Sequence, residues 1–130
     1  PMEQRDNAWF AGYGDNLKRS LTFGVDEGER AIHFENWVSL EDGSDKGLLQ
    51  VSEDGEAWTS LPEVYTGKEE KWNHEKVELP EGTKFVRFVY QTDATVNGRG
   101  WYVNDVYGTD SSCEKKRLEV IENQWDERGW

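Results

Sequence analysis

Apolar and polar residues alternate in several short segments of this 130-residue chain. Alternation with a period of two is typical of β-strands that bury one face. The pattern is clearest at residues 83–92, where Val86, Phe88 and Tyr90 share one face. The other face of this segment is also largely apolar, so we expect it to lie in the middle of its sheet. The whole pattern predicts strands at residues 17–25, 31–40, 47–52, 57–61, 74–79, 83–92 and 100–107.

Turn-forming residues separate these segments. Asp54-Gly55 is a strong hairpin signal, because this dipeptide accepts positive φ angles at little cost. Pro80-Glu81-Gly82 forms a second turn signal. Short strands at this spacing, with turns between them, favour an all-β sandwich over an α/β fold. We therefore assign residues 1–110 to a single β-sandwich domain.

Residues 111–130 have a different pattern and form a charged C-terminal tail. Ser111 and Glu114 match the capping box that opens many helices. Three apolar side chains follow at helix-like spacing, namely Leu118, Ile121 and Trp125. This pattern predicts a short amphipathic helix from about residue 112 to 124, lying on the sandwich or on a neighbouring domain. The alternative is a frayed tail.

The charge balance excludes some classes of partner. There are 15 basic and 27 acidic residues, which gives a net charge of −12. Such a surface repels phosphate backbones, so we expect no nucleic acid partner. No apolar run approaches the roughly 20 residues that a membrane-spanning helix needs. The single cysteine, Cys113, cannot form an internal disulfide.

Five segments, in order, resemble one known family. They are WFAGYGDNL at 9–17, FENW at 34–37 with Glu41 and Asp45, VSEDGEAWTSL at 51–61, VRF at 86–88 with Thr92-Asp93, and GWYVNDV at 100–106. Together they resemble the jelly-roll domain that accompanies immune inhibitor A peptidases. Similar domains accompany other secreted bacterial proteases, including bacillopeptidase F types. The resemblance covers residues 9–107.

The resemblance implies a jelly-roll β-sandwich similar to MAM and galactose-binding-like modules. It also implies a secreted or cell-surface bacterial location, with any export signal outside this chain. Its function would be that of an accessory domain, which stabilises a larger parent protein or binds a partner.

Catalytic signatures are absent from the sequence. The zinc-peptidase motif His-Glu-x-x-His does not occur, and neither does the Gly-x-Ser-x-Gly elbow of serine hydrolases. The only histidines are His33 and His74, and neither has a metal-ligand neighbour at short spacing. A zinc site would therefore have to be assembled from residues distant in sequence. We expect a protein that is not an enzyme.

Acidic residues in loops raise the alternative of a structural calcium ion, because calcium takes six to eight oxygen ligands. Asp105 is notable because it lies within an aromatic strand, where an uncompensated carboxylate would be unfavourable. A structural role in a cap or a turn is a simpler explanation for any one of these acidic residues. We predict calcium ligands at Asp105, Asp45 and Glu41, with further acidic loop positions at Asp15, Asp26 and Asp93.

A carbohydrate-binding module is the main alternative function. Sandwiches of this kind can stack exposed aromatic rings on sugars. The candidate rings are Trp9, Tyr13, Trp58, Tyr65 and Trp72. An exposed coplanar row would favour sugar binding, and buried rings would favour the accessory role. The expected partners are thus neighbouring domains of a larger parent, or a protein or carbohydrate ligand.

Overall fold

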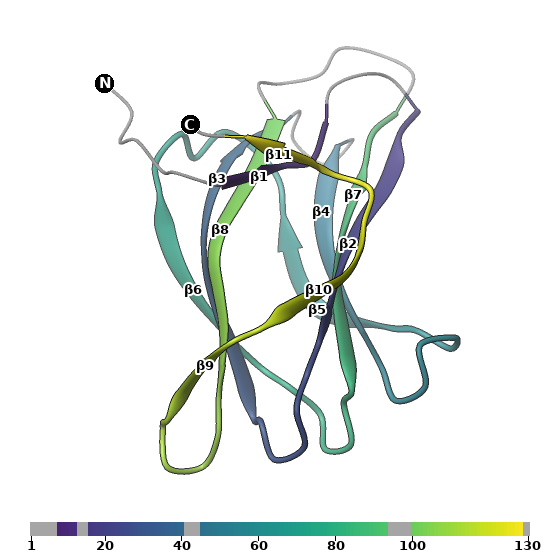
Figure 1. The fold of residues 1–130 in the computed structure, drawn as a ribbon. Coiled ribbons are helices and arrows are strands. Elements are labelled where there is room, and N and C mark those ends of the chain that lie inside the picture. Colours follow the sequence, from purple (N-terminus) through teal and green to yellow (C-terminus); the bar gives the residue numbers. More distant parts are fainter. Residues whose placement is uncertain (1–7, 13–15, 41–44, 94–99, 129–130) are drawn as a thin grey trace.

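The computed structural model describes residues 8–12, 16–40, 45–93 and 100–128. Within these ranges the protein contains strands and no helix, so no described helix could cross a membrane. The strands form two antiparallel sheets that face one another as a sandwich (Figure 1). The prediction of an all-β sandwich is therefore confirmed.

Six of the described strands belong to sheet A and five to sheet B. Sheet A contains β1 (Ala8–Phe10), β3 (Ala31–Ser39), β6 (Asn73–Glu78), β8 (Gly100–Thr109), β9 (Lys115–Arg117) and β11 (Asp126–Arg128). Sheet B contains β2 (Lys18–Gly24), β4 (Lys46–Ser52), β5 (Thr59–Tyr65), β7 (Phe85–Gln91) and β10 (Glu119–Asn123). The strand orders are β11-β1-β8-β3-β6, with β9 also on β8, and β10-β2-β7-β4-β5.

The strands predicted from alternation are present with small differences in their bounds. β7 lies between β2 and β4, which confirms the central position expected for residues 83–92. β5 continues to Tyr65, beyond the predicted end at residue 61. Pro62 is accommodated because β5 is an edge strand of sheet B and Pro62 lies where the register with β4 shifts.

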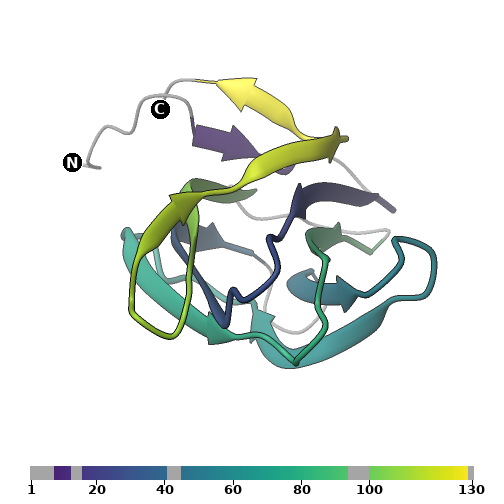
Figure 2. The ribbon, with the colours of Figure 1, turned by 60° about the horizontal axis from the view of Figure 1, so that its bottom comes forward.

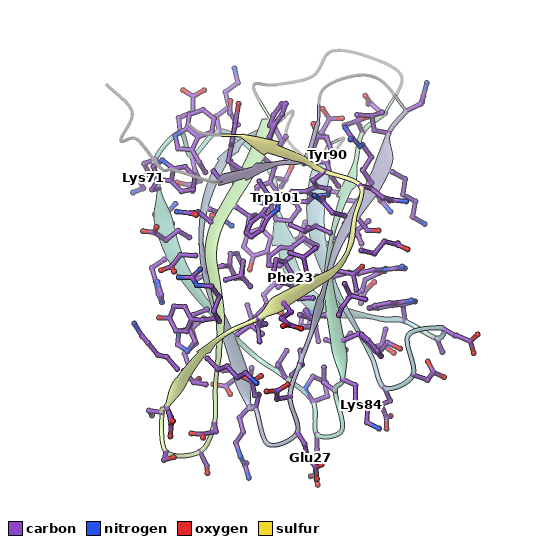
Figure 3. All side chains as sticks on the ribbon, viewed as in Figure 1. Phe23, Glu27, Lys71, Lys84, Tyr90 and Trp101 are labelled. Atoms are coloured by element: carbon purple, nitrogen blue, oxygen red, sulfur yellow. The ribbon has the colours of Figure 1, made fainter. Side chains whose placement is uncertain are left out.

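Aromatic rings fill the space between the two sheets. Trp101 and Phe88 are fully buried, with their ring centroids 5.9 Å apart. Phe34 meets Phe88 edge to face at 4.9 Å, a favoured geometry for aromatic pairs. Figure 3 shows Trp101, Phe23 and Tyr90 between the sheets, with charged side chains around the outside. Large rings thus compensate for the low hydrophobic content of 35%.

The predicted helix at residues 112–124 is wrong. This segment belongs to a C-terminal strap (residues 115–128) in which β9 pairs with β8, β10 with β2 and β11 with β1. The strap therefore leaves sheet A, joins sheet B and returns to sheet A along one side of the sandwich (Figures 1 and 2).

Local hydrogen bonds explain why the capping box does not open a helix. Asp110 Oδ1 accepts the backbone N–H groups of Ser112 at 2.9 Å and Glu114 at 3.1 Å. Cys113 takes a positive φ of 62°, which closes a turn between β8 and β9. Leu118 and Trp125 are buried, whereas the residues of β10 between them are exposed. The apolar positions thus anchor a strand-forming strap at two points.

The two ends of the described chain lie side by side. In the register of β1 and β11, Ala8 is paired with Arg128. The strand β1 lies within the polar stretch 1–18, where no strand was expected. Its formation depends on β8 and β11, which supply the neighbouring strands on both sides. The chain therefore enters and leaves the sandwich at one place.

Candidate functional site

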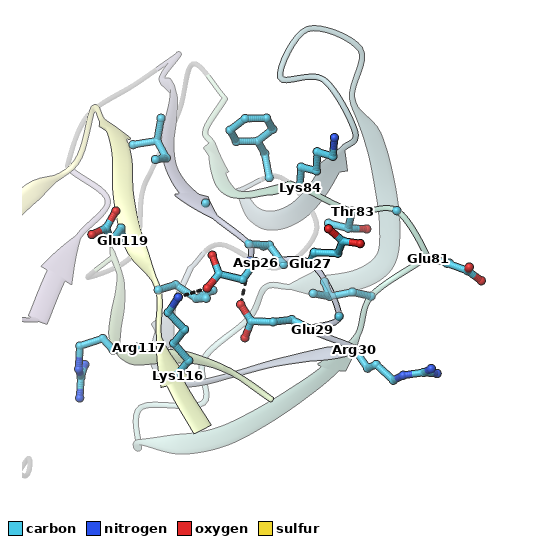
Figure 4. A pocket seen from close by; sticks show the side chains of 18 of the residues that line it. Asp26, Glu27, Glu29, Arg30, Glu81, Thr83, Lys84, Lys116, Arg117 and Glu119 are labelled. Atoms are coloured by element: carbon cyan, nitrogen blue, oxygen red, sulfur yellow. Dashed lines mark hydrogen bonds and ion pairs between the residues drawn. The ribbon is translucent and has the colours of Figure 1, made fainter. Parts of the chain in front are cut away.

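A cavity of about 1030 Å³ opens at the end of the sandwich drawn lowest in Figure 1. The β2–β3 loop, the β6–β7 turn and the C-terminal strap surround it (Figure 4). Its apolar lining comes from Val25, Leu79, Phe85, Leu118 and Ile121. Its charged lining includes Asp26, Glu27, Glu29, Glu81, Lys84 and Lys116.

Glu29 is held firmly at the wall of this cavity. Its Oε1 accepts the backbone N–H of Asp26 at 2.9 Å, and Asp26 forms an ion pair with Lys116 (Figure 4). Its Oε2 lies against the backbone of Gly108, at a place that a Cβ would occupy. Burial raises the pKa of the Glu29 carboxyl, and the nearby Asp110 carboxylate raises it further. Glu29 is thus packed against β8 in an environment that disfavours its charge.

The cavity lining contains no histidine or cysteine. The hydroxyl of Thr83 donates to the carbonyl of Pro80 at 2.7 Å, which commits it to the turn. The described lining therefore provides no paired nucleophile and base of the kind that hydrolases use. The described lining mixes apolar and charged groups.

A second cluster lies on the outer face of sheet A, where both histidines of the chain meet. His33 Nδ1 is 3.3 Å from His74 Nε2, although 41 residues separate them in sequence. His33 Nε2 lies 3.1 Å from the hydroxyl oxygen of Thr109. The His33 ring stacks on Tyr107, with ring centroids 4.7 Å apart and planes 4° from parallel. Burial lowers the pKa of His33, and His74, Lys76 and Lys115 lower it further.

Sequence reasoning missed this cluster. His33 and His74 each occupy an outward position of a predicted strand, and the alternation of apolar and polar residues showed this orientation. The sequence pattern did not show that β3 pairs with β6, and this pairing brings the two histidines together.

Asp105 lies at a β-bulge in β8. His33 pairs with Tyr107 and Glu35 pairs with Asn104. Two residues of β8, one of them Asp105, are therefore opposite the single residue that separates His33 from Glu35 on β3. The φ of Asp105 is 55°, in the left-handed region, which aspartate tolerates better than most residues. The carboxylate is half-exposed and accepts a hydrogen bond from Arg117 Nη2 at 3.0 Å. An ion pair with the strap therefore accounts for the acid within this aromatic strand.

The other predicted calcium ligands are placed separately. Asp45 is fully buried before β4, in sheet B, and its Oδ1 accepts the backbone N–H of Asp93 at 3.1 Å. Glu41 lies outside the described residues. Within the described part of the chain, no group of three or more His, Cys, Asp or Glu side chains is arranged to hold a metal ion.

The rings considered for sugar stacking are engaged within the protein or half-buried. Arg87 lies over the Trp58 ring at 4.0 Å, and Tyr65 stacks on Trp101 with centroids 5.7 Å apart. Trp9 and Trp72 are half-buried, and Tyr13 lies outside the described residues. The exposed large hydrophobic side chains of the described chain are Val64, Val120 and Ile121. The described surface therefore presents no exposed aromatic row.

The fold and these sites define a two-sheet β-sandwich with no catalytic constellation among its described residues. No protein-family model matches the chain. The chain is similar to bacillopeptidase F of Bacillus subtilis (strain 168), with 34% identity over 93 residues, or 69% of this chain. The match spans 6% of the length of bacillopeptidase F, so the similarity concerns a small part of that protein.

Proposed function

We propose that this chain is a non-catalytic accessory domain of a secreted bacterial peptidase. The observation that carries the proposal is the 34% identity to bacillopeptidase F, confined to 6% of that protein. A match of this extent fits one module of a larger peptidase. The domain would stabilise its parent outside the cell or bind a partner there.

The chemistry of the described residues supports a non-catalytic role. The two histidines contact each other, Tyr107 and Thr109, with no serine or cysteine among these contacts. Cys113 is exposed on the turn between β8 and β9. The cavity at the lower end also lacks a nucleophile–base pair in its described lining. Binding and structural support are the roles that such a surface can perform.

We infer a jelly-roll relationship to the immune inhibitor A peptidases and MAM-like modules. Its support is that the resembling segments fall on strands of both sheets. Residues 34–37 lie in β3, which pairs with β8 in sheet A, and β7 pairs with β4 in sheet B. Residues 51–61 span the β4–β5 hairpin, residues 86–88 lie in β7, and residues 100–106 lie in β8. The adjacent ends, Ala8 and Arg128, also suit a module whose flanking chain would attach at one place.

A structural calcium ion remains part of the proposal, centred on Asp45. Asp45 is fully buried and its Oδ1 accepts the backbone N–H of Asp93, and carboxylate oxygens held in this way at a loop are the type of ligand that calcium prefers. Glu41 is the second proposed ligand. Asp105 is the third, but its carboxylate is engaged by Arg117, so it would have to exchange that ion pair for the metal.

The accessory role can be tested in the proposed parent peptidase that contains this chain. Residues 8–128 should be deleted, because the pairing of Ala8 with Arg128 leaves the two cut ends adjacent. We expect the shortened peptidase to keep its kcat on a small chromogenic peptide and to lose thermal stability or secreted yield. A folded, shortened enzyme that loses its kcat on the small peptide would contradict a non-catalytic role.

The isolated chain provides the complementary test. Incubated with casein, with and without zinc, it should release no peptides above the buffer control. Hydrolysis that co-purifies with the chain and is abolished by His33→Gln or Cys113→Ser would show a catalytic function. A parent gene product without peptidase activity would contradict the proposed context.

A further inference from the structure

The contact between His33 and His74 follows from the register of two neighbouring strands. His33 on β3 is opposite Lys76 on β6, and Glu35 is opposite His74. The two histidines are therefore diagonal neighbours on one face of sheet A. Their facing nitrogens, His33 Nδ1 and His74 Nε2, are 3.3 Å apart.

The His33 ring is fixed in orientation by its surroundings. It stacks on Tyr107 and has Nε2 at 3.1 Å from Thr109 Oγ1. In the tautomer in which Nε2–H donates to Thr109, Nδ1 carries a lone pair directed toward His74. Metal-binding histidines characteristically donate their second ring N–H to an oxygen in this way. Thr109 is buried, so this orienting group is itself held in place.

We propose that His33 Nδ1 and His74 Nε2 form a surface site for a divalent transition metal ion of the zinc class. Two nitrogens bound to tetrahedral zinc at about 2.0–2.1 Å lie roughly 3.3–3.4 Å apart. The observed separation of 3.3 Å matches this spacing before any metal binds. Water fills the remaining coordination positions, because His74 is exposed to solvent.

Binding requires only a change of tautomer at one ring. Without metal, His74 Nε2–H donates to the Nδ1 lone pair of His33. With metal, the His74 proton moves through solvent from Nε2 to Nδ1, and both facing nitrogens donate their lone pairs to the ion. Both rings stay neutral, and the metal takes the place of the shared proton. The ion would link edge strand β6 to β3.

The ligand atoms define the class of metal, and nearby lysines affect the strength of binding. Lys115 Nζ lies 4.6 Å from the Tyr107 ring centroid, and Lys76 is directly opposite His33. These positive charges oppose any cation at the site, whereas the nitrogen ligands disfavour hard cations such as calcium, which prefer oxygen ligands. Zinc, nickel and copper form stronger bonds to imidazole. We therefore expect Lys76→Ala to tighten metal binding.

The test is a titration of the 130-residue chain with zinc chloride after removal of any polyhistidine tag. Calorimetry should show one equivalent bound, and the ring ¹⁵N resonances of both histidines should shift. His33→Gln and His74→Gln should each lose this binding. Thr109→Val should weaken it by roughly 10- to 100-fold, the usual effect of removing an orienting partner.

Cys113→Ser is the matched control, because Cys113 is an exposed soft ligand outside the proposed site. Its zinc binding should equal that of the unmodified chain. The proposal is overturned by absence of binding, by binding that survives in both histidine variants, or by loss of binding in Cys113→Ser. If a histidine variant does not fold, the ring resonances of the unmodified chain decide, and zinc that shifts neither ring overturns the site.

Discussion

Gly47 on β4 packs directly against the indole ring of Trp101 on β8. A Cβ at position 47 would lie 2.5 Å from Trp101 Cζ3. This contact joins the two sheets, because β4 belongs to sheet B and β8 to sheet A. Trp101 is fully buried and also meets Trp125 of the C-terminal strap, with centroids 5.0 Å apart. The absence of a side chain at position 47 therefore sets the position of the central ring of the core.

Gly47→Ala should destabilise the protein by about 1–3 kcal/mol, because the added methyl group forces the Trp101 ring to move in a packed core. Urea unfolding monitored by tryptophan fluorescence measures the change. Gly24→Ala is the control, since a Cβ there would meet Ile121 Cδ1, the end of an exposed side chain, at 3.3 Å. Equal effects at positions 47 and 24 would contradict the packing argument.

Trp125→Ala should cost about 3–5 kcal/mol, as truncation of a buried aromatic residue usually does. Trp125 is buried, and its Nε1–H donates to the carbonyl of Arg19 at 3.1 Å. Ile121→Ala, at an exposed position of the same strap, should change stability by less than about 0.5 kcal/mol. Thermal unfolding of both variants tests the strap, and a frayed tail would make both substitutions neutral.

Asp105→Val should be more destabilising than Asp105→Asn. A β-branched residue is strained at a φ of 55°, by about 1–2 kcal/mol, whereas asparagine tolerates this conformation. Both variants lose the charge that pairs with Arg117, but asparagine keeps an oxygen that can accept from Arg117, so backbone strain and the lost hydrogen bond both disfavour valine. Chemical denaturation gives the comparison. If valine is the more stable of the two, the bulge assignment at position 105 is incorrect.

Glu29→Gln should raise the melting temperature at pH 7 and leave it nearly unchanged at pH 4. The pKa of Glu29 is raised in the folded state, first by burial and then by Asp110. The folded state therefore binds more protons than the unfolded one, and stability falls as pH rises above the ordinary carboxyl pKa of 4.5. Gln removes this loss and keeps an acceptor for the Asp26 N–H. Glu27→Gln, an exposed change on the same loop, serves as the control.

The calcium proposal predicts that millimolar calcium raises the melting temperature more than magnesium does. A site filled at a hundredfold excess over Kd adds about 2.7 kcal/mol to the free energy of unfolding. Asp45→Asn should remove most of the gain. Asp105→Asn should lower the gain by less, because the Asp105 carboxylate must first give up its ion pair with Arg117 to bind the metal. Melting curves that coincide in calcium and in a chelator would exclude the ion.

Much of the sheet structure could be predicted from local pattern. The alternation at residues 83–92 identified β7 and its central position, and the predicted inward residues Val86, Phe88 and Tyr90 are all buried. The Asp54-Gly55 turn was equally local: Asp54 Oδ1 accepts the N–H groups of Glu56 and Ala57, and Gly55 has a φ of 83°. In each case the residues that determine the conformation lie within a few positions of one another.

The C-terminal strap shows where local pattern failed. Leu118, Ile121 and Trp125 have helix-like spacing, but short apolar patterns do not distinguish a helix from a strand. The open edges of β2, β1 and β8 offered backbone partners along the segment. Backbone groups next to an open sheet edge gain hydrogen bonds as strands, and an isolated short helix is marginal in water. The conformation of this segment therefore depended on distant strands: β10 pairs with β2, which lies more than 90 residues earlier in the sequence.

The sequence by itself determined the all-β class, the principal strands and the main turns, because side-chain alternation and turn chemistry act over a few residues. Tertiary structure alone decided which strands became neighbours. That pairing placed His33 beside His74, turned Asp105 toward Arg117 through a bulge, and set Gly47 against Trp101. Each relationship joins segments from different strands. Its position depends on register and on the packing of the two sheets, which no local window of sequence contains.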